Sequence, residues 1–243
     1  LEYNLLAISE REKIIGKNHP DYLISLSNLA FLYSIMGEND KSLDCDLKIL
    51  ELREKILGNN HPDYALSLNN VAMDYMHLGN YREALEFNLK ALVSYEKLYG
   101  KEHPEYALCI SNIALAYTYI GEDSKALEYN LQALQIREKK LGKYHIDYAM
   151  SLNNIGMNYS NIGKFPKALE YNFEALKIRE LILGNDHLDC ATSLNNIAVN
   201  YAYLGEFKRA LEFNLKAIEI SLYPPRSDSV ISIISIFHPR FSA

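Results

Sequence analysis

The sequence predicts an all-α solenoid built from antiparallel helix pairs, and three observations lead to this prediction. The first is a fixed 42-residue step, which separates Gly16 from Gly58 and recurs along the chain. The second is that each unit contains two helical patterns of apolar residues, and the third is that no unit contains a strand-like pattern. A period of this size indicates units that bury their apolar faces only against neighbouring units. An ordinary globular domain, or a pair of them, is therefore excluded.

Four sets of residues keep this step in all five copies. They are the two glycine sets Gly16, Gly58, Gly100, Gly142, Gly184 and Gly37, Gly79, Gly121, Gly163, Gly205, the histidines His19, His61, His103, His145, His187 and the tyrosines Tyr33, Tyr75, Tyr117, Tyr159, Tyr201. The array is expected to cover residues 1–222, with a half repeat over residues 1–18 followed by five units that keep the 42-residue step.

The second copy illustrates the two helices of a unit. In the first helix, five apolar residues share one face, and the pattern stops at Gly79, a suitable left-handed C-terminal residue. These residues are Leu68, Val71, Ala72, Tyr75 and Leu78. The second helix is expected from Arg82 to Tyr99 and ends at Gly100. A short connection over residues 101–105 follows, in which Pro104 suits the first turn of the next helix.

The two ends of the chain depart from the full repeat. Leu1 corresponds to Leu43, inside a second helix, so the sequence is expected to be a fragment of a longer array. At the other end, Pro224 and Pro225 stop the helical pattern. Residues 223–243 are expected to form a non-repeat tail that is disordered. The alternative is that its apolar run, residues 230–237, docks weakly as a cap over the last helix.

Composition excludes several classes of function. The chain carries 25 Lys and Arg against 31 Asp and Glu, and this acidic balance makes nucleic-acid binding unexpected. No apolar stretch approaches the roughly 20 residues that cross a bilayer, so no membrane span is expected. The three cysteines are too scattered for a disulfide framework, which favours a reducing, cytoplasmic setting.

No motif for catalysis, cofactor binding or metal binding is visible, so we predict that the chain is not an enzyme and needs no cofactor. The five repeated histidines lie in different units, whose helices pack about 8–10 Å apart, so they cannot share one metal ion. We expect them to be turn or helix-cap residues.

The order of small residues, tyrosine and glycine resembles the tetratricopeptide repeat. In the second copy the residues that carry this resemblance are Val71, Ala72, Tyr75, Gly79, Ala84 and Ala91. The unit is longer than the usual length of about 34 residues for this repeat. Its extra residues, with the run from Ile136 to Gly142 and the phrase His-Pro-Asp-Tyr, are similar to the long variant found in kinesin light chains. The resemblance implies a right-handed superhelix of helix pairs.

One position departs from the family pattern. Asparagine stands where an aromatic or apolar residue is usual, at Asn88, Asn130, Asn172 and Asn214, with Asp46 and Asn4 at the equivalent places. Because buried polar groups must be paired, we expect these amides to satisfy backbone groups between repeats.

A second stripe on each first helix is the candidate functional surface. It lies about 200° around the helix from the small-residue face. Asparagine is a poor helix former, yet it fills one stripe position in every copy: Asn28, Asn70, Asn112, Asn154 and Asn196. The resemblance implies that first helices line a concave groove in which these amides hold an extended peptide. The alternative is a structural ladder of amides between adjacent helices, and the two can coexist.

The remaining groove candidates are Met73, His77, Leu115, Tyr119, Met157, Asn161 and Tyr203. The stripe holds no Lys or Arg, so we expect a protein or peptide partner that is mostly neutral and has apolar anchors. The predicted function is a protein-interaction scaffold. Two rivals remain, a regulatory or sensor arm of a larger signalling enzyme and a passive spacer without a ligand.

Overall fold

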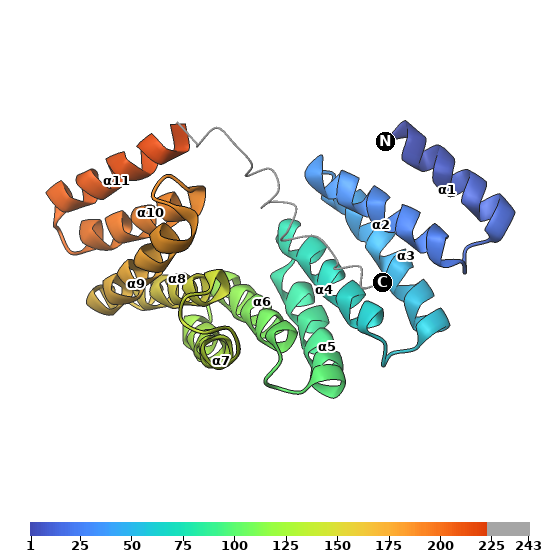
Figure 1. Cartoon of the computed structure of the whole chain (residues 1–243), viewed down its shortest axis with the longest axis horizontal. Coiled ribbons are helices and arrows are strands. Elements are labelled where there is room, and N and C mark those ends of the chain that lie inside the picture. Colours follow the sequence, from blue (N-terminus) through green and yellow to red (C-terminus); the bar gives the residue numbers. More distant parts are fainter. Residues whose placement is uncertain (223–243) are drawn as a thin grey trace. The chain divides into compact units, whose positions relative to one another are not determined.

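The computed structural model describes residues 1–222, and every regular element in that part of the chain is an α-helix (Figure 1). The helices are α1 (Glu2–Ile15), α2 (Pro20–Ile35), α3 (Asn39–Leu57), α4 (Pro62–His77), α5 (Tyr81–Tyr99), α6 (Pro104–Ile120), α7 (Asp123–Leu141), α8 (Ile146–Asn161), α9 (Phe165–Leu183), α10 (Leu188–Tyr203) and α11 (Phe207–Leu222). The all-α class is confirmed. The expectations for the tail, residues 223–243, lie outside the described residues.

The helix boundaries follow the repeat. First helices are α2, α4, α6, α8 and α10, and α1 is the second helix of a half repeat. The turn after α4 contains Gly79, whose φ of 77° lies in the left-handed region that glycine adopts without strain. Pro104 is the first residue of α6, where its missing N–H has no helical partner to lose.

The helices divide into two compact units. The first comprises residues 1–143 with residues 161–163, and the second comprises residues 144–160 with the described residues from 164 onward. Within the first unit, α1 to α7 contact one another in chain order. Within the second, α9 contacts α10 and α10 contacts α11.

Alanines lie at the centre of the packing. Ala84 and Ala91 are fully buried on α5, and so are their counterparts Ala126, Ala133, Ala168 and Ala175. In the first unit, Ala91 and Ala133 share one apolar cluster with Leu68 and Ile110. In the second unit, Ala191 and Ala217 share a cluster with Ile197. Because alanine projects one methyl group, second helices can lie close to the helices they pack on.

Each first helix begins at a histidine. The Nδ1 atoms of His19, His61, His103, His145 and His187 accept a hydrogen bond from the backbone N–H two residues later, at 3.1 to 3.2 Å. These bonds satisfy one of the free N–H groups at each helix start. The prediction that the repeated histidines are cap residues is confirmed.

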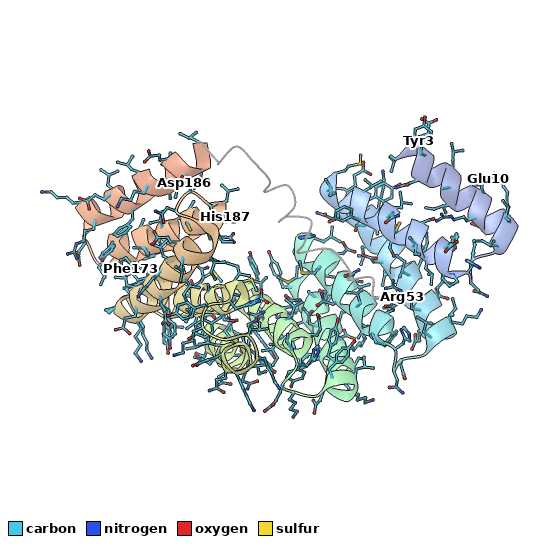
Figure 2. All side chains as sticks on the ribbon, viewed as in Figure 1. Tyr3, Glu10, Arg53, Phe173, Asp186 and His187 are labelled. Carbon is cyan, nitrogen blue, oxygen red and sulfur yellow. The ribbon has the colours of Figure 1, made fainter. Side chains whose placement is uncertain are left out.

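The first helix of the chain shows what the half repeat leaves uncovered. Tyr3 of α1 is 88% exposed and projects into solvent (Figure 2). The corresponding Cys45 of α3 is buried, in a cluster that contains Leu26 and Leu29 of α2. Tyr3 is exposed because α1 has no first helix of its own repeat among the described residues.

Candidate functional site: the asparagine stripe of the first helices

The asparagine stripe lies at the surface of the first helices. Asn28 is exposed on α2, whereas the other four stripe asparagines are half-buried. Asn28 and Asn70 make no side-chain hydrogen bond within the described part of the chain. Their amides therefore offer donors and an acceptor to a ligand.

Two stripe asparagines form rungs of a ladder. The Asn112 Nδ2 atom of α6 donates to Asn69 Oδ1 of α4 at 2.7 Å. The Asn196 Nδ2 atom of α10 donates to Asn153 Oδ1 of α8 at 3.1 Å. Each rung joins the first helices of consecutive repeats. The ladder that sequence reasoning left open is therefore present once in each unit.

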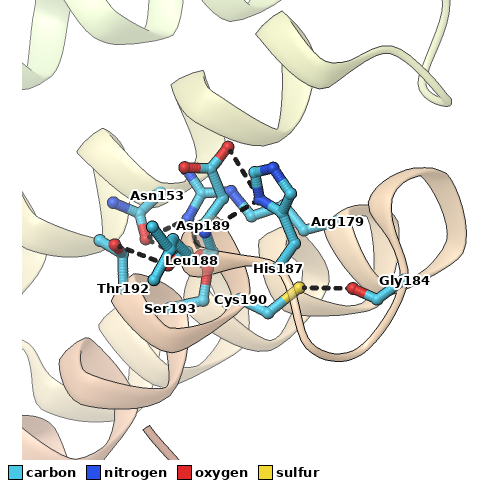
Figure 3. A network of polar contacts seen from close by, with 9 residues as sticks. All are labelled: Asn153, Arg179, Gly184, His187, Leu188, Asp189, Cys190, Thr192 and Ser193. Atoms are coloured by element: carbon cyan, nitrogen blue, oxygen red, sulfur yellow. Dashed lines mark hydrogen bonds and ion pairs between the residues drawn. The ribbon is translucent and has the colours of Figure 1, made fainter. Parts of the chain in front are cut away.

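Ladder acceptor Asn153 belongs to a larger polar network in the second unit (Figure 3). The Arg179 guanidinium of α9 donates to the Asp189 carbonyl oxygen at 2.9 Å and to Ser193 Oγ at 2.7 Å. It also lies 3.5 Å from Asn153 Oδ1. The network joins the second helix α9 to the two first helices α8 and α10. Burial lowers the pKa of Arg179 from its usual value, yet guanidinium stays charged at neutral pH.

The same arginine contact occurs twice in the first unit. Arg53 of α3 donates to the Asp63 carbonyl oxygen at 3.1 Å and to Ser67 Oγ at 2.8 Å. Arg11 of α1 makes the equivalent two contacts, to Asp21 and Ser25. These arginines were missed in the sequence, where charged residues were assigned to solvated faces.

A paired exception gives the signal that could have revealed them. Between the second and third copies, the arginine position is Tyr95 and the serine position is Cys109, so both members change together. Tyr95 and Cys109 are buried in one apolar cluster, and the Cys109 thiol donates to the Asn88 carbonyl oxygen at 3.3 Å. Burial raises the pKa of the Cys109 thiol to about 12, so it stays protonated.

The groove candidates at the ends of first helices contact the preceding repeat. Tyr119 stacks on Tyr81, with 4.7 Å between ring centroids. Tyr203 stacks on Phe165 at 4.9 Å. Asn161 Nδ2 donates to Asp123 Oδ1 at 2.7 Å. The two tyrosines still expose more than half of their surface, 56% for Tyr119 and 67% for Tyr203. One ring face is therefore fixed and the remaining surface is accessible.

The apolar part of the stripe is shallow. Met73, Leu115 and Met157 are half-buried, and His77 is exposed. Phe31, the first-copy counterpart of Met73, is 41% exposed and was not among the candidates. The 42-residue step alone would have identified it. In the first unit, Phe31, Met73 and Leu115 thus form one apolar row across α2, α4 and α6.

The prediction for the departing asparagines is wrong at Asn172. This side chain is fully buried, but neither its oxygen nor its nitrogen has a hydrogen-bond partner. It packs instead against Gly156 of α8, where a Cβ atom would lie 2.1 Å from Asn172 Oδ1. The amide thus fills the space that the missing Gly156 side chain leaves.

The equivalent position on α3 is an acid. Asp46 is buried and within hydrogen-bonding reach of the Asp74 carboxyl group on α4. Burial, together with the neighbouring Asp74 carboxylate, raises the pKa of Asp46 to about 8. The nearby Arg53 guanidinium lowers the pKa of Asp46, but this effect is smaller than the combined effect of burial and Asp74. At least one of the two carboxyl groups is therefore protonated near neutral pH.

Among residues 1–222, His, Cys, Asp and Glu side chains do not gather in a group of three or more that could hold a metal ion. None of the helices in this range combines the length and apolar character needed to span a bilayer.

Comparisons with known proteins agree on the repeat. A family model described as tetratricopeptide repeat matches residues 21–75, 63–139, 124–180 and 147–222. No match was found among curated protein sequences.

Three solved structures are similar to this chain. The first is a variant of the nearly identical TPR-like repeats of a kinesin light chain from Podospora anserina. It is 25% identical in sequence and has a TM-score of 0.71, and the match covers 86% of this chain and 99% of that one. BtubC from P. vanneervenii is 20% identical, with a TM-score of 0.75 over 100% of this chain and 94% of that one. NprR in complex with its cognate peptide NprX is 20% identical, with a TM-score of 0.66, and the match covers 96% of this chain and 66% of that one. With four family matches that together span residues 21–222, the chain belongs to the tetratricopeptide-repeat family.

Proposed function

We propose that this chain is a protein-interaction scaffold that binds an extended, mostly neutral segment of a partner along its first helices. The observation that carries the proposal is the unpaired amides of Asn28 and Asn70 beside the apolar row of Phe31, Met73 and Leu115. NprR, a structure of similar fold, was solved with its cognate peptide. That likeness supports a peptide as the ligand class.

The ladder and the ligand do not compete for the same atoms. An asparagine amide carries two N–H donors and a carbonyl oxygen with two acceptor sites. The rung from Asn112 to Asn69 uses one N–H of Asn112 and leaves its oxygen available. The ladder holds the Asn112 side chain in one orientation, which reduces the entropy lost on binding.

Hydrogen bonds from asparagine amides to a ligand backbone favour an extended chain but do not depend on the side chains of the ligand. A typical hydrogen bond contributes about 1 kcal/mol net, so a few amides give at best about millimolar affinity. Most of the affinity must therefore come from apolar side chains of the ligand seated on the row of Phe31, Met73 and Leu115. Since the stripe holds no Lys or Arg, a ligand rich in carboxylates would lose hydration without gaining a partner.

The proposal is tested by selecting 12-residue peptides against the chain and titrating the best one, labelled with a fluorophore, into three proteins. We expect the double variant Asn28→Ala, Asn70→Ala to bind at least tenfold more weakly than the unchanged chain. The matched control is Asn80→Ala, outside the stripe, which should bind normally. If all three proteins bind the peptide with equal affinity and have equal helicity, Asn28 and Asn70 do not contact the ligand.

A second variant separates the ladder from the ligand. Asn69→Ala removes the acceptor of the rung but leaves the other stripe amides in place. We expect it to lower the free energy of unfolding and to weaken binding less than the double variant does. If Asn69→Ala abolishes binding while Asn28 and Asn70 are dispensable, the ligand contacts the ladder rather than the free amides.

A further inference from the structure

Exposed apolar side chains lie in the turn before α8 and at the end of α9. Tyr144, in the turn, is 75% exposed, and Leu181 and Ile182, on the last turn of α9, are 67% and 41% exposed. All three residues belong to the second compact unit. Neighbouring apolar side chains that stay exposed mark a surface where another molecule binds.

The repeat step places Tyr144 beside Leu181. Tyr144 corresponds to Glu102 of the preceding repeat, and Leu181 corresponds to Lys139. Glu102 and Lys139 form an ion pair between the turn before α6 and the end of α7. One repeat later, the two members of this ion pair are both replaced by large apolar residues.

The replacement occurs in this repeat alone. The residues that correspond to Tyr144 in the other copies are all polar: Asn18, Asn60, Glu102 and Asp186. The residues that correspond to Leu181 are all lysines: Lys13, Lys55, Lys97 and Lys139. Two facing positions have therefore changed together from polar to apolar.

Contact between Tyr144 and Leu181 does not account for this change. In the preceding repeat, the Glu102 and Lys139 side chains are 59% and 62% exposed. Tyr144 and Leu181 are no less exposed, so the apolar pair buries little of its surface. Apolar surface contributes free energy, about 25 cal/mol per Å², only where it is removed from water. Most of that contribution is available here to a molecule that covers the pair.

The charges around these residues are mainly negative. In three other repeats, the glutamate at the position of Glu180 pairs with a lysine five residues later, at 3.2 to 3.3 Å. Asn185 replaces that lysine here, so Glu180 has no ion pair within residues 1–222. The exposed Asp186, in the turn after α9 (Figure 2), is also unpaired in the described part of the chain. One cation, Lys177, lies about one helical turn before Leu181, on the side away from this turn.

We propose that Tyr144, Leu181 and Ile182, with Glu180 and Asp186 beside them, form a docking surface for a basic amphipathic segment of a partner protein. Apolar side chains of that segment cover the first three residues, and its Lys or Arg side chains pair with the two carboxylates. Unpaired carboxylates beside an apolar surface favour such a segment over an acidic one. This surface is separate from the asparagine stripe, which lies along the first helices.

The probe is a 14-residue peptide of leucine and lysine, patterned as an amphipathic helix and titrated into the full chain by calorimetry. The variant Tyr144→Asn, Leu181→Lys introduces the residues that stand at Asn60 and Lys97. We expect it to keep its helicity and to bind the peptide at least tenfold more weakly. The matched control is Val93→Lys, which adds the same charge at an apolar residue that is 53% exposed on α5. It should bind like the unchanged chain.

A second variant tests the charges without changing the apolar residues. Glu180→Gln, Asp186→Asn should bind the basic peptide at least threefold more weakly than the unchanged chain does. A peptide with glutamate in place of every lysine should bind the unchanged chain at least tenfold more weakly than the basic peptide does.

Four results would overturn the proposal. The first is an absence of saturable binding of the basic peptide, and the second is equal binding of the basic peptide to the unchanged chain and to Tyr144→Asn, Leu181→Lys. The third is loss of binding in Asn28→Ala, Asn70→Ala instead, which would place the peptide on the stripe. The fourth is a dimer of the unchanged chain, seen by light scattering, that Tyr144→Asn, Leu181→Lys dissociates, since a second copy would then cover this surface.

Discussion

The carboxyl groups of Asp46 on α3 and Asp74 on α4 face each other inside the first unit, where both side chains are buried. Burial raises the pKa of Asp74 overall, although a hydrogen bond with Ser42 and the nearby His77 lower it. The nearby Arg53 lowers the pKa of Asp46. Two carboxylates this close cannot both be charged without strong repulsion. The pair therefore makes the stability of this unit depend on pH.

The direction of this dependence follows from the raised pKa of Asp46. In the folded chain it holds its proton up to about pH 8, whereas in the unfolded chain it releases the proton near pH 4. Its contribution to stability is thus complete in acid and is lost as the pH rises from about 4 to 8. We expect Asp46→Asn, which copies the residue of the other repeats, to remove this slope.

Urea unfolding at pH 5 and pH 8 measures the effect. At pH 8, Asp46→Asn should be more stable than the unchanged chain by at least about 1 kcal/mol, since one pKa unit corresponds to about 1.4 kcal/mol. Asp40→Asn, at an exposed position of the same helix, is the control. A pH slope that Asp46→Asn leaves unaltered would contradict the prediction.

The Arg179 network should contribute far more stability than an exposed ion pair. Arg179→Ala leaves the Asp189 carbonyl oxygen and Ser193 Oγ without their donor, at a cost of about 2 to 3 kcal/mol. Arg209→Ala removes an exposed ion pair with Glu206 and a cation–π contact with Tyr201, 5.4 Å from the ring centroid, and should cost about 1 kcal/mol or less. Chemical denaturation compares the two, and equal costs would mean that the network adds nothing.

The paired exception at Tyr95 and Cys109 predicts energetic coupling. Tyr95→Arg alone buries a guanidinium without the serine that accepts from it in other repeats, so it should destabilise the first unit. Adding Cys109→Ser supplies that acceptor. In a double-mutant cycle we expect a favourable coupling of about 1 kcal/mol or more. Additive effects of the two changes would show that the positions are independent.

The stack of Tyr119 on Tyr81 should be measurable as well. Tyr119→Ala is expected to cost about 0.5 to 1.5 kcal/mol, the usual contribution of an aromatic pair. Tyr119→Phe keeps the ring and should be neutral. Tyr144→Ala removes a tyrosine that is 75% exposed and should cost little. If Tyr119→Phe is as costly as Tyr119→Ala, the hydroxyl group rather than the ring carries the contribution.

Features that depend on one repeat were predictable from the sequence. The 42-residue step, the helix limits near Gly79 and Gly100, and the histidine caps all follow from local patterns that recur. Local periodicity and turn chemistry determine such features without knowledge of the neighbouring repeat.

Features that join two repeats were less accessible. Sequence alone left the ladder and the peptide as alternatives, because an asparagine amide suits both. Asp46 was singled out by its repeat position, but its pairing with Asp74 was missed because the two residues lie on different repeats. Arg179 was missed for a similar reason, since only its contact with Ser193 shows that its charge is buried.

The end contacts of the first helices restrict how such an array can change over evolution. Tyr81 meets Tyr119, Asp123 meets Asn161 and Phe165 meets Tyr203, so aromatic and polar junctions alternate. Loss of one 42-residue repeat would place Tyr81 against Asn161, an aromatic ring against an amide. Loss of two repeats would place Tyr81 against Tyr203, a ring against a ring. The order of the repeats therefore matters, because these contacts match only in that order. Repeats can be gained or lost in pairs without a mismatched contact.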